Sequence, residues 1–272
     1  MSLITISQSM GSADPDIAKI VANKLNLELF DDQRLRDRAM QLEIKSEDLK
    51  GLDEKAPGFF DRFLSSKPES YLEYMESVIY EVAKEGQGVI MGHGSQILLR
   101  DFGCALHVLI HASEPYRIEQ LGKKQGLGPE VARKLILKSD NEKKGFFKFA
   151  FNLNWDDPSL YDLMINSGKL GSEAAASLII ATARLDEIKT CSLTALETME
   201  KLSQERAVRA VLLKHNVNLT LLHLEVPQKG TLALRGFAYS EEDKERVIKL
   251  VKSVPGIASV TPEISILEYM DV

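Results

Sequence analysis

Mainly aliphatic or β-branched runs alternate with amphipathic segments from residue 3 to about residue 202. The runs at 3–7, 88–92 and 105–110 show no regular polar alternation, which is typical of strands buried on both faces of a parallel sheet. The segments between them have helical periodicity, so the pattern predicts a doubly wound α/β domain. The expected helices are 17–25, 31–42, 69–85, 117–124, 129–144, 173–183 and 192–202, and further strands are expected at 27–30 and 161–165.

The region from residue 203 onward has a different pattern of apolar and polar residues. Residues 222–226 and 232–235 alternate apolar and polar side chains on either side of a Gln-Lys-Gly turn, which predicts a hairpin with one buried face. Two flanking helices and a last strand complete a small α+β domain of the order α-β-β-α-β. These elements are expected at 204–215, 240–253 and 257–266, and they divide the chain into domains 1–202 and 203–272.

Composition narrows the classes of function. The 272 residues are 44% hydrophobic with a net charge of -6, and they carry no basic stripe that would mark a nucleic-acid surface. No apolar run reaches the roughly 18 residues of a membrane span and no leader precedes the first strand, so a cytoplasmic protein is expected. Cys104 and Cys191 lack metal or redox spacing, which favours two free buried thiols.

A loop, residues 8–13, separates the first strand from the first helix. Strand, loop and helix in this order resemble a P-loop, whose pattern G-x-x-x-x-G-K-S/T supplies inward backbone N–H groups, a lysine for the outer phosphates and a hydroxyl for magnesium. Here Asp14 stands at the lysine position and Pro15 at the hydroxyl position. A carboxylate ~4 Å from a phosphate costs about 4 kcal/mol at an effective dielectric of ~20, which argues against tight triphosphate binding in the usual pose.

The loop keeps other features of an anion site. Asp14-Pro15-Asp16 is a strong helix start, with a carboxylate N-cap and proline at the first helical position. The loop is therefore either a nucleotide cradle of backbone N–H groups or an empty turn. The candidate phosphate-binding residues are Ser9, Met10, Gly11, Ser12, Ala13 and Asp14.

Several other segments allow two interpretations each. Helix 173–183 is apolar nearly all round, so either the domain core or a second subunit must cover it. The phenylalanines of 146–151 form either a lid over a ligand or a hydrophobic surface that closes on the core or on a second subunit. Trp155 and Tyr161 are expected to pack in the core, and the acids before Pro158 resemble a turn start as much as a magnesium-facing pair.

A set of short stretches occurs in a specific order along the first two hundred or so residues. They are Ile4-Thr5-Ile6-Ser7 with Gly11-Ser12, Phe30-Asp31, Gly92-His93-Gly94, Ser139-Asp140, and Trp155-Asp156-Asp157-Pro158 leading to Tyr161-Asp162-Leu163-Met164-Ile165-Asn166. In this order they resemble the cytidylate kinase-like family. The resemblance implies a P-loop kinase fold, ATP with Mg²⁺ as the donor and a pyrimidine monophosphate such as CMP as the acceptor; it names no metal ligand.

The resemblance also implies site residues. Asp31, Arg34 and His93 would surround the acceptor, and Arg117 and Lys143 would neutralise the charge of phosphoryl transfer. His93 between two glycines is as readily a turn histidine. The family tends to have more glycines and an arginine in the loop, and arginines where His93, Leu109 and Lys143 stand. The loss of several cations together suggests a degenerate kinase.

The tail carries a second resemblance. Leu232-x-Leu234-x-Gly236, Ser240-Glu241-Glu242 and Val254-Pro255-Gly256-Ile257 are similar to the pattern of a BON module. That resemblance implies a domain that binds a ligand or a partner. Two functions therefore stay open: a nucleoside monophosphate kinase, or a catalytically degenerate kinase fold that senses a nucleotide or forms a dimeric scaffold.

Overall fold

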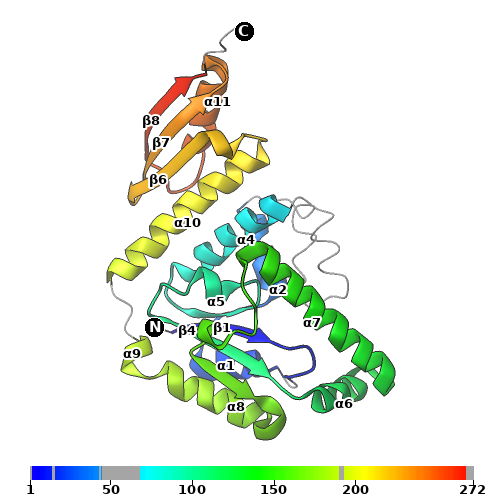
Figure 1. Cartoon of the computed structure of the whole chain (residues 1–272). Coiled ribbons are helices and arrows are strands. Elements are labelled where there is room, and N and C mark those ends of the chain that lie inside the picture. The colour runs from blue at the N-terminus through cyan, green and yellow to red at the C-terminus, as the bar shows by residue number, and fades with distance from the viewer. Residues whose placement is uncertain (1, 14–15, 43, 45–67, 190–192, 268–272) are drawn as a thin grey trace.

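The computed structural model describes residues 2–13, 16–42, 44, 68–189 and 193–267. It shows a larger α/β body and a smaller α+β body, which a long helix connects (Figure 1). Asp14 and Pro15, most of the expected insertion at 51–68, and Cys191 lie outside the described residues. Within the described residues, none of the helices combines the length and the apolar character that crossing a membrane requires.

The larger body contains a parallel sheet of five strands in the order β2-β3-β1-β4-β5. The central strand β1 pairs with β3 on one side and with β4 on the other, so Thr5 faces Ile90 and His107 in the register. The prediction of a doubly wound parallel sheet is confirmed. The strands are β1 (Leu3–Gln8), β2 (Leu29–Phe30), β3 (Gly88–Met91), β4 (Ala105–His111) and β5 (Leu163–Asn166).

Helices cover both faces of this sheet. Ile4 and Ile6 point from β1 to the face covered by α1 (Ile17–Leu25) and α8 (Ser167–Ala183). Leu3 points to the other face, where it packs in one core with residues of the later helix α10 (Leu193–Lys214) and of four helices of the larger body. These are α2 (Asp32–Gln41), α4 (Pro68–Ala83), the short α5 (Ser95–Leu98) and α7 (Pro129–Phe151), and α7 is preceded by α6 (Glu114–Gln125) (Figure 1).

The structure shows where the phenylalanines of 146–151 and the apolar helix α8 pack. Phe146 and Phe147 are fully buried within α7 and make edge-to-face contacts with each other, with ring centroids 5.6 Å apart. They close on the core rather than lining a ligand site. Helix α8 buries Ala175, Ala176 and Ile179 against α1 and the sheet, while Leu178 stays 45% exposed. Cover by a second subunit stays a prediction.

The smaller body is a three-stranded sheet with helices on one side. Strands β6 (Leu222–Gln228) and β7 (Thr231–Ala238) form the expected hairpin, and β8 (Ser259–Ile266) pairs with β7 in parallel. Val208, Leu232 and Val251 belong to its separate hydrophobic core. The remaining elements are η2 (Leu219–Leu221) and α11 (Glu241–Lys252), and the larger body also contains η1 (Pro158–Leu160) and α9 (Asp186–Lys189).

The two helices expected at 192–202 and 204–215 are one helix, α10 (Leu193–Lys214). Met199 and Ala210 lie in the core of the larger body, whereas Val208 and Leu212 lie in the core of the smaller body. Because the second half of the helix buries a different face in each core, apolar positions occur on two sides of one continuous helix. The division of the chain at residue 203 stays a prediction.

Polar contacts fix α10 on α4. Arg209 donates to the carboxylate of Glu73 through two nitrogens, one at 2.6 Å, and Arg206 lies 2.9 Å from Glu76. The Ser203 hydroxyl donates to Glu81 at 2.8 Å. Burial raises the pKa of the Glu76 carboxyl, although Arg206 opposes the shift. The smaller body is therefore anchored to the larger body through α4.

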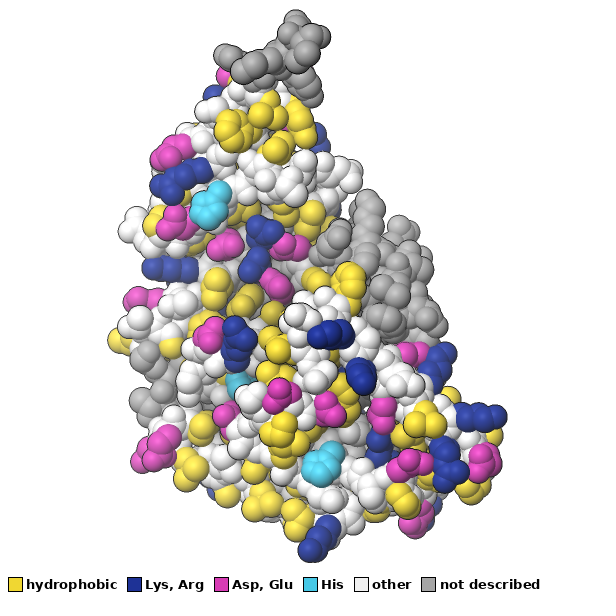
Figure 2. Space-filling model, in the orientation of Figure 1, with side chains coloured by type: hydrophobic (Ala, Val, Ile, Leu, Met, Phe, Trp, Pro, Cys, Tyr) yellow, Lys and Arg dark blue, Asp and Glu magenta, His cyan; other side chains and the backbone are white. Residues whose placement is uncertain are grey.

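Charged side chains of both signs are mixed on the surface of the protein. Figure 2 shows basic and acidic side chains interspersed over the described residues of one face, in the smaller body as well as the larger. Exposed ion pairs contribute to this mixing, such as Lys24 with Glu173 at 2.8 Å and Arg235 with Glu263 at 2.9 Å. Such pairs add only up to about 1 kcal/mol each, so the surface charges do little to determine the fold.

Cys104, the residue before β4, takes part in a disulfide bond. The expectation of a free thiol at this position is therefore wrong.

Candidate functional site

The loop after β1 lies at the carboxyl ends of the strands. Because β1 is flanked by β3 and β4, this is the point where the strand order reverses, and open α/β sheets bind ligands at such points. The Ser9 N–H donates to the Ile110 carbonyl at 3.0 Å, which ties the loop to β4. The buried Ser12 hydroxyl lies 2.7 Å from the Ser9 carbonyl and 3.1 Å from the Ile110 carbonyl. Ser9 and Ser12 thus shape the loop from inside.

Gly11 allows the loop to turn close to α6. Its φ of +78° lies in the left-handed region, and a Cβ atom at this position would stand 2.8 Å from the Arg117 carbonyl oxygen. A side chain here would meet backbone, which cannot move aside as a flexible side chain can. The glycine is therefore required by both conformation and space.

We expect Gly11→Ala to lower the free energy of unfolding by about 1 to 2 kcal/mol, because an L-residue in this conformation is strained. Thermal and urea unfolding measure the effect. Gly103→Ala is the matched control, since a Cβ at Gly103 meets nothing within 4 Å, and it should stay within about 0.5 kcal/mol of the unchanged protein. Equal effects of the two substitutions would contradict this account of the loop.

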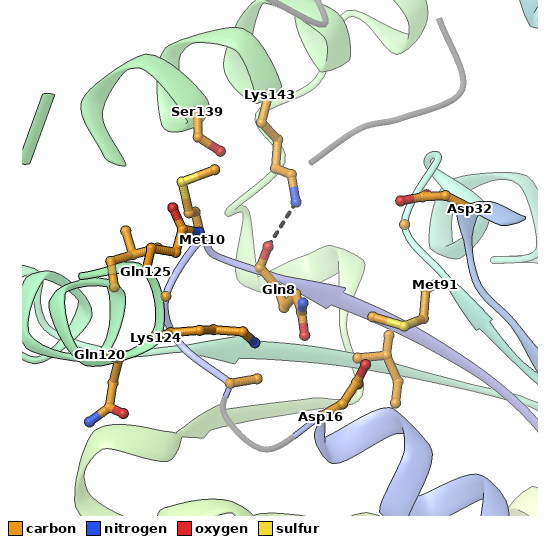
Figure 3. A pocket seen from close by; sticks show the side chains of 15 residues that line it. Gln8, Met10, Asp16, Asp32, Met91, Gln120, Lys124, Gln125, Ser139 and Lys143 are labelled. Carbon is orange, nitrogen blue, oxygen red and sulfur yellow. Dashed lines mark hydrogen bonds between the residues drawn. The ribbon is translucent and has the colours of Figure 1, made fainter. Parts of the chain in front are cut away.

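A cavity of ≈230 Å³ opens beside the loop (Figure 3). Residues of the loop and of the end of β1 line it, together with the N-cap residue of α1 and residues of α2, α6, α7 and the end of β3. Figure 3 shows Lys124 and Lys143 on the side of α6 and α7, with Asp16 and Asp32 on the opposite side. The lining residues are Ile6, Gln8, Met10, Gly11, Ala13, Asp16, Asp32, Met91, Gly92, Gln120, Leu121, Lys124, Gln125, Ser139 and Lys143.

Arg117, expected to neutralise charge in the reaction, has another position. Its guanidinium makes a two-pronged ion pair with Asp140, at 2.9 and 2.7 Å, and its Nε donates to the Met10 carbonyl at 2.7 Å. Arg117 is only 7% exposed and does not line the cavity. It joins α6, α7 and the loop into one frame, and these buried, charge-assisted bonds commit its nitrogens.

Lys143 does reach the cavity. Its Nζ donates to the Gln8 carbonyl at 2.9 Å, at the end of β1, and lies 5.0 Å from the centre of the Trp155 ring. Trp155 is buried, as expected for a packing residue, and the cation–π contact gives its ring a second role. Lys144, the next residue, is exposed and stands outside the cavity lining.

His93 is a buried connector between the cavity and α4. Its φ of +56° is unusual for a non-glycine residue, and only 1% of its surface is exposed. Nε2 lies 2.8 Å from Asp32 Oδ1, and Nδ1 lies 3.3 Å from the Tyr71 hydroxyl. His93 therefore fixes the orientation of the Asp32 carboxylate, which lines the cavity.

The acceptor residues expected at the end of β2 are not brought together with His93. Asp31 is the N-cap of α2 and accepts from the Arg34 N–H at 3.0 Å. The Arg34 side chain is 61% exposed, with its Nε 4.0 Å from Glu28. Neither residue lines the cavity, whereas the neighbouring Asp32 does. The N-cap and the first helical residue point in different directions. The side chain of Asp31 therefore caps the helix, while that of the next residue, Asp32, lines the cavity.

Two oxygen atoms beside the loop accept no hydrogen bond from the described residues. They are Gln8 Oε1 and Asp16 Oδ1, both buried as atoms and both on cavity-lining residues. Asp157, by contrast, accepts from the Ser159 N–H at 2.9 Å, and this bond lowers the pKa of its carboxyl. Asp157 is thus the N-cap of the η1 turn, so it has the role of a turn start that was one of the two interpretations of the acids before Pro158. Among the described residues, no group of three or more His, Cys, Asp or Glu could hold a metal ion.

The fold and the loop define a P-loop kinase-like α/β protein. The Cytidylate kinase-like family matches residues 3–169, more than half of the chain, and the chain belongs to this family. A protein named cytidylate kinase from Archaeoglobus fulgidus is 29% identical over 68% of this chain and 97% of its own length. Another of that name, from Methanocaldococcus jannaschii, is 25% identical over 69% of this chain and 99% of its own length.

A solved structure supports the fold. It is an uncharacterised protein from Eubacterium ventriosum, with a TM-score of 0.54 and 20% identity, which covers 67% of this chain and 98% of that chain. These relatives account for the larger body. At this identity the likeness shows the fold alone.

Proposed function

We propose that the protein binds a nucleoside triphosphate at the loop and transfers its terminal phosphoryl group to a nucleoside monophosphate such as CMP. One observation carries the proposal: the cavity beside the loop has amines on one side and a fixed carboxylate on the other. Phosphoryl transfer depends mainly on positioning and on charge neutralisation, which this arrangement can supply. Membership of the family supports the same reaction class.

In the proposed reaction, an oxygen of the acceptor phosphate forms a bond to the terminal phosphorus of the donor. The bond from that phosphorus to the bridging oxygen breaks, and two nucleoside diphosphates result. The acceptor phosphate is already ionised at neutral pH, so no side chain has to remove a proton. Lys143 stands beside the loop, where negative charge on the donor would lie.

Asp32 supports a cytosine acceptor. Its carboxylate accepts hydrogen bonds but donates none when ionised, and His93 holds it in one orientation. The exocyclic amino group of cytosine is a donor, whereas uracil presents a carbonyl oxygen at the same ring position. A fixed carboxylate therefore favours CMP over UMP. We place the acceptor base on the Asp32 side of the cavity.

Magnesium, which the family implies, fits the oxygen atoms present. Mg²⁺ prefers oxygen ligands and is commonly bound through one or two carboxylates plus substrate phosphates. Asp16 and Gln8, whose side-chain oxygens Oδ1 and Oε1 accept no hydrogen bond from the described residues, would hold it with the phosphates of the donor. When bound, the ion neutralises charge on the transferred group.

The direct test is the formation of CDP from CMP and ATP with Mg²⁺, followed by ³¹P NMR and anion-exchange chromatography. We expect CDP to accumulate, with UMP used at least tenfold less efficiently, since one buried hydrogen-bond mismatch is worth about 1.4 kcal/mol or more. Asp32→Asn should narrow this preference, because an amide can also donate to uracil. Absence of CDP at high protein concentration would refute the proposed transfer.

A regulatory function is the second candidate. Asp14 replaces the lysine of the loop pattern, and Arg117 is committed to Asp140, so two expected cations are missing from the cavity. In this alternative the larger body only senses a nucleotide, and the BON-like smaller body binds a ligand or partner. Saturable ATP binding without CDP formation would favour it over the kinase.

A further inference from the structure

We propose that Lys124 and Lys143 together bind the donor phosphates in place of the missing loop lysine. This inference rests on the proposed binding of a nucleoside triphosphate in the same cavity. Both lysines line that cavity, and they come from different helices, α6 and α7. Figure 3 shows both side chains extending toward the loop region from their helices. The positive charge thus comes from α6 and α7 and not from the loop.

The frame of Arg117 and Asp140 explains how two separate helices can position these amines. Lys124 follows Arg117 by seven residues, two helical turns, and so lies on the same face of α6. Lys143 follows Asp140 by three residues and shares its face of α7. The ion pair between Arg117 and Asp140 therefore turns the lysine-bearing faces of both helices toward the loop.

The frame also links both helices to the loop backbone. Arg117 donates to the Met10 carbonyl, and Lys143 donates to the Gln8 carbonyl two residues earlier. A lysine ammonium has three N–H donors, so a bond to the loop backbone is compatible with a contact to a phosphate oxygen at the same place. Lys124 approaches the loop from the α6 side of the cavity. Two amines on different helices can therefore contact two phosphate groups of the same triphosphate.

The charges along the cavity match a polyphosphate that carries a metal ion. The lysines stand on the side of α6 and α7, and the carboxylate of Asp16, the proposed magnesium ligand, stands on the other side. Free triphosphate should therefore meet attraction from one side only. A phosphate chain whose other side carries Mg²⁺ meets attraction from both sides. The site thus favours the magnesium complex of a di- or triphosphate over the bare anion.

The test is isothermal titration of the full chain with ATP and with inorganic triphosphate, each with Mg²⁺. Lys124→Gln and Lys143→Gln should each weaken binding of both ligands about tenfold, because each removes a charge-assisted hydrogen bond, and the double variant should weaken it about a hundredfold. Inorganic triphosphate isolates the phosphate contacts from those of the base. Circular dichroism and the melting temperature verify that each variant is folded.

Neighbouring lysines give matched controls. Lys123 is exposed and pairs with Glu119 at 2.5 Å, and Lys144 is exposed outside the cavity. Lys123→Gln and Lys144→Gln remove the same net charge one residue away, so they should change the affinity less than about twofold. If all four single variants lose affinity equally, the effect is general electrostatics and the proposal is overturned.

The result separates this inference from the proposed kinase reaction. Lysine-dependent triphosphate binding without CDP formation would keep the inference and refute the transfer. CDP formation with unchanged affinity in Lys124→Gln and Lys143→Gln would keep the transfer and overturn the inference. A chain that binds neither ATP nor inorganic triphosphate would overturn both.

Discussion

Replacement of Arg117 by alanine should strongly destabilise the larger body, because it leaves Asp140 and the loop without a shared partner. Arg117 is 7% exposed, while the Asp140 side chain is 33% exposed. Breaking a fully buried ion pair costs about 3 to 5 kcal/mol, and partial solvation of Asp140 reduces the expected loss to about 2 to 4 kcal/mol. Urea unfolding measures the change in the free energy of unfolding.

A second ion pair between the same helices provides the control. Arg133 on α7 lies 2.9 Å from Glu114 on α6, but both side chains are nearly half exposed. Arg133→Ala should therefore cost no more than about 0.5 kcal/mol. A double-mutant cycle with Arg117→Ala and Asp140→Ala should show a coupling energy of about 1 to 3 kcal/mol, as expected for residues in one network. Additive losses would contradict the assignment of Arg117 to the frame.

The same substitution tests how the frame acts on ligand binding. Arg117→Ala should weaken triphosphate binding even though Arg117 does not line the cavity, because α6 and α7 lose their fixed relation. In Arg117→Ala, weaker binding should be accompanied by a lower free energy of unfolding. Lys124→Gln should weaken binding while the free energy of unfolding stays the same. This difference separates a positioning residue from one that contacts the ligand.

The sequence predicted the architecture of the larger body because its strands are continuous apolar runs. Burial on both faces leaves this pattern in the chain itself, and β1, β3 and β4 lie within a residue or so of the expected positions. The small hairpin was equally visible, since one exposed face produces alternation. Helix α10 was harder, because its second half packs Ala210 in one core and Val208 and Leu212 in the other, so the apolar residues occupy two faces of one helix.

The candidate site could be predicted only in part. Position along the chain identified the loop, and Lys143 was found through the family pattern. The sequence could not show that Arg117 would be committed to Asp140, because that contact joins residues of different helices. Lys124 was missed because a lysine near a helix end is ordinary on a surface. Asp31 was chosen instead of Asp32 because the sequence does not show which of two adjacent acidic side chains points toward the cavity.

The contact between the two bodies yields the second large effect. Glu73 accepts from Arg209 through both oxygens and also lies 3.6 Å from Arg206. Glu73→Gln would leave Arg209 without its charge partner and Arg206 with Glu76 alone, and both arginines are about three-quarters buried. We expect a loss of about 2 to 3 kcal/mol in the free energy of unfolding at neutral pH, somewhat below the cost of breaking a fully buried pair. Thermal unfolding at several pH values measures it.

Glu76→Gln should behave differently although Glu76 lies in the same network. Burial raises the pKa of Glu76 above its ordinary value, with Glu73 adding to the shift and Arg206 opposing it. Between the ordinary and the raised pKa, the folded state binds more protons than the unfolded state, so this group's contribution to stability falls as pH rises. Relative to the unchanged protein, Glu76→Gln should therefore gain stability from about pH 4.5 upward. A difference in unfolding free energy that stays constant across pH would contradict this interpretation of the interface.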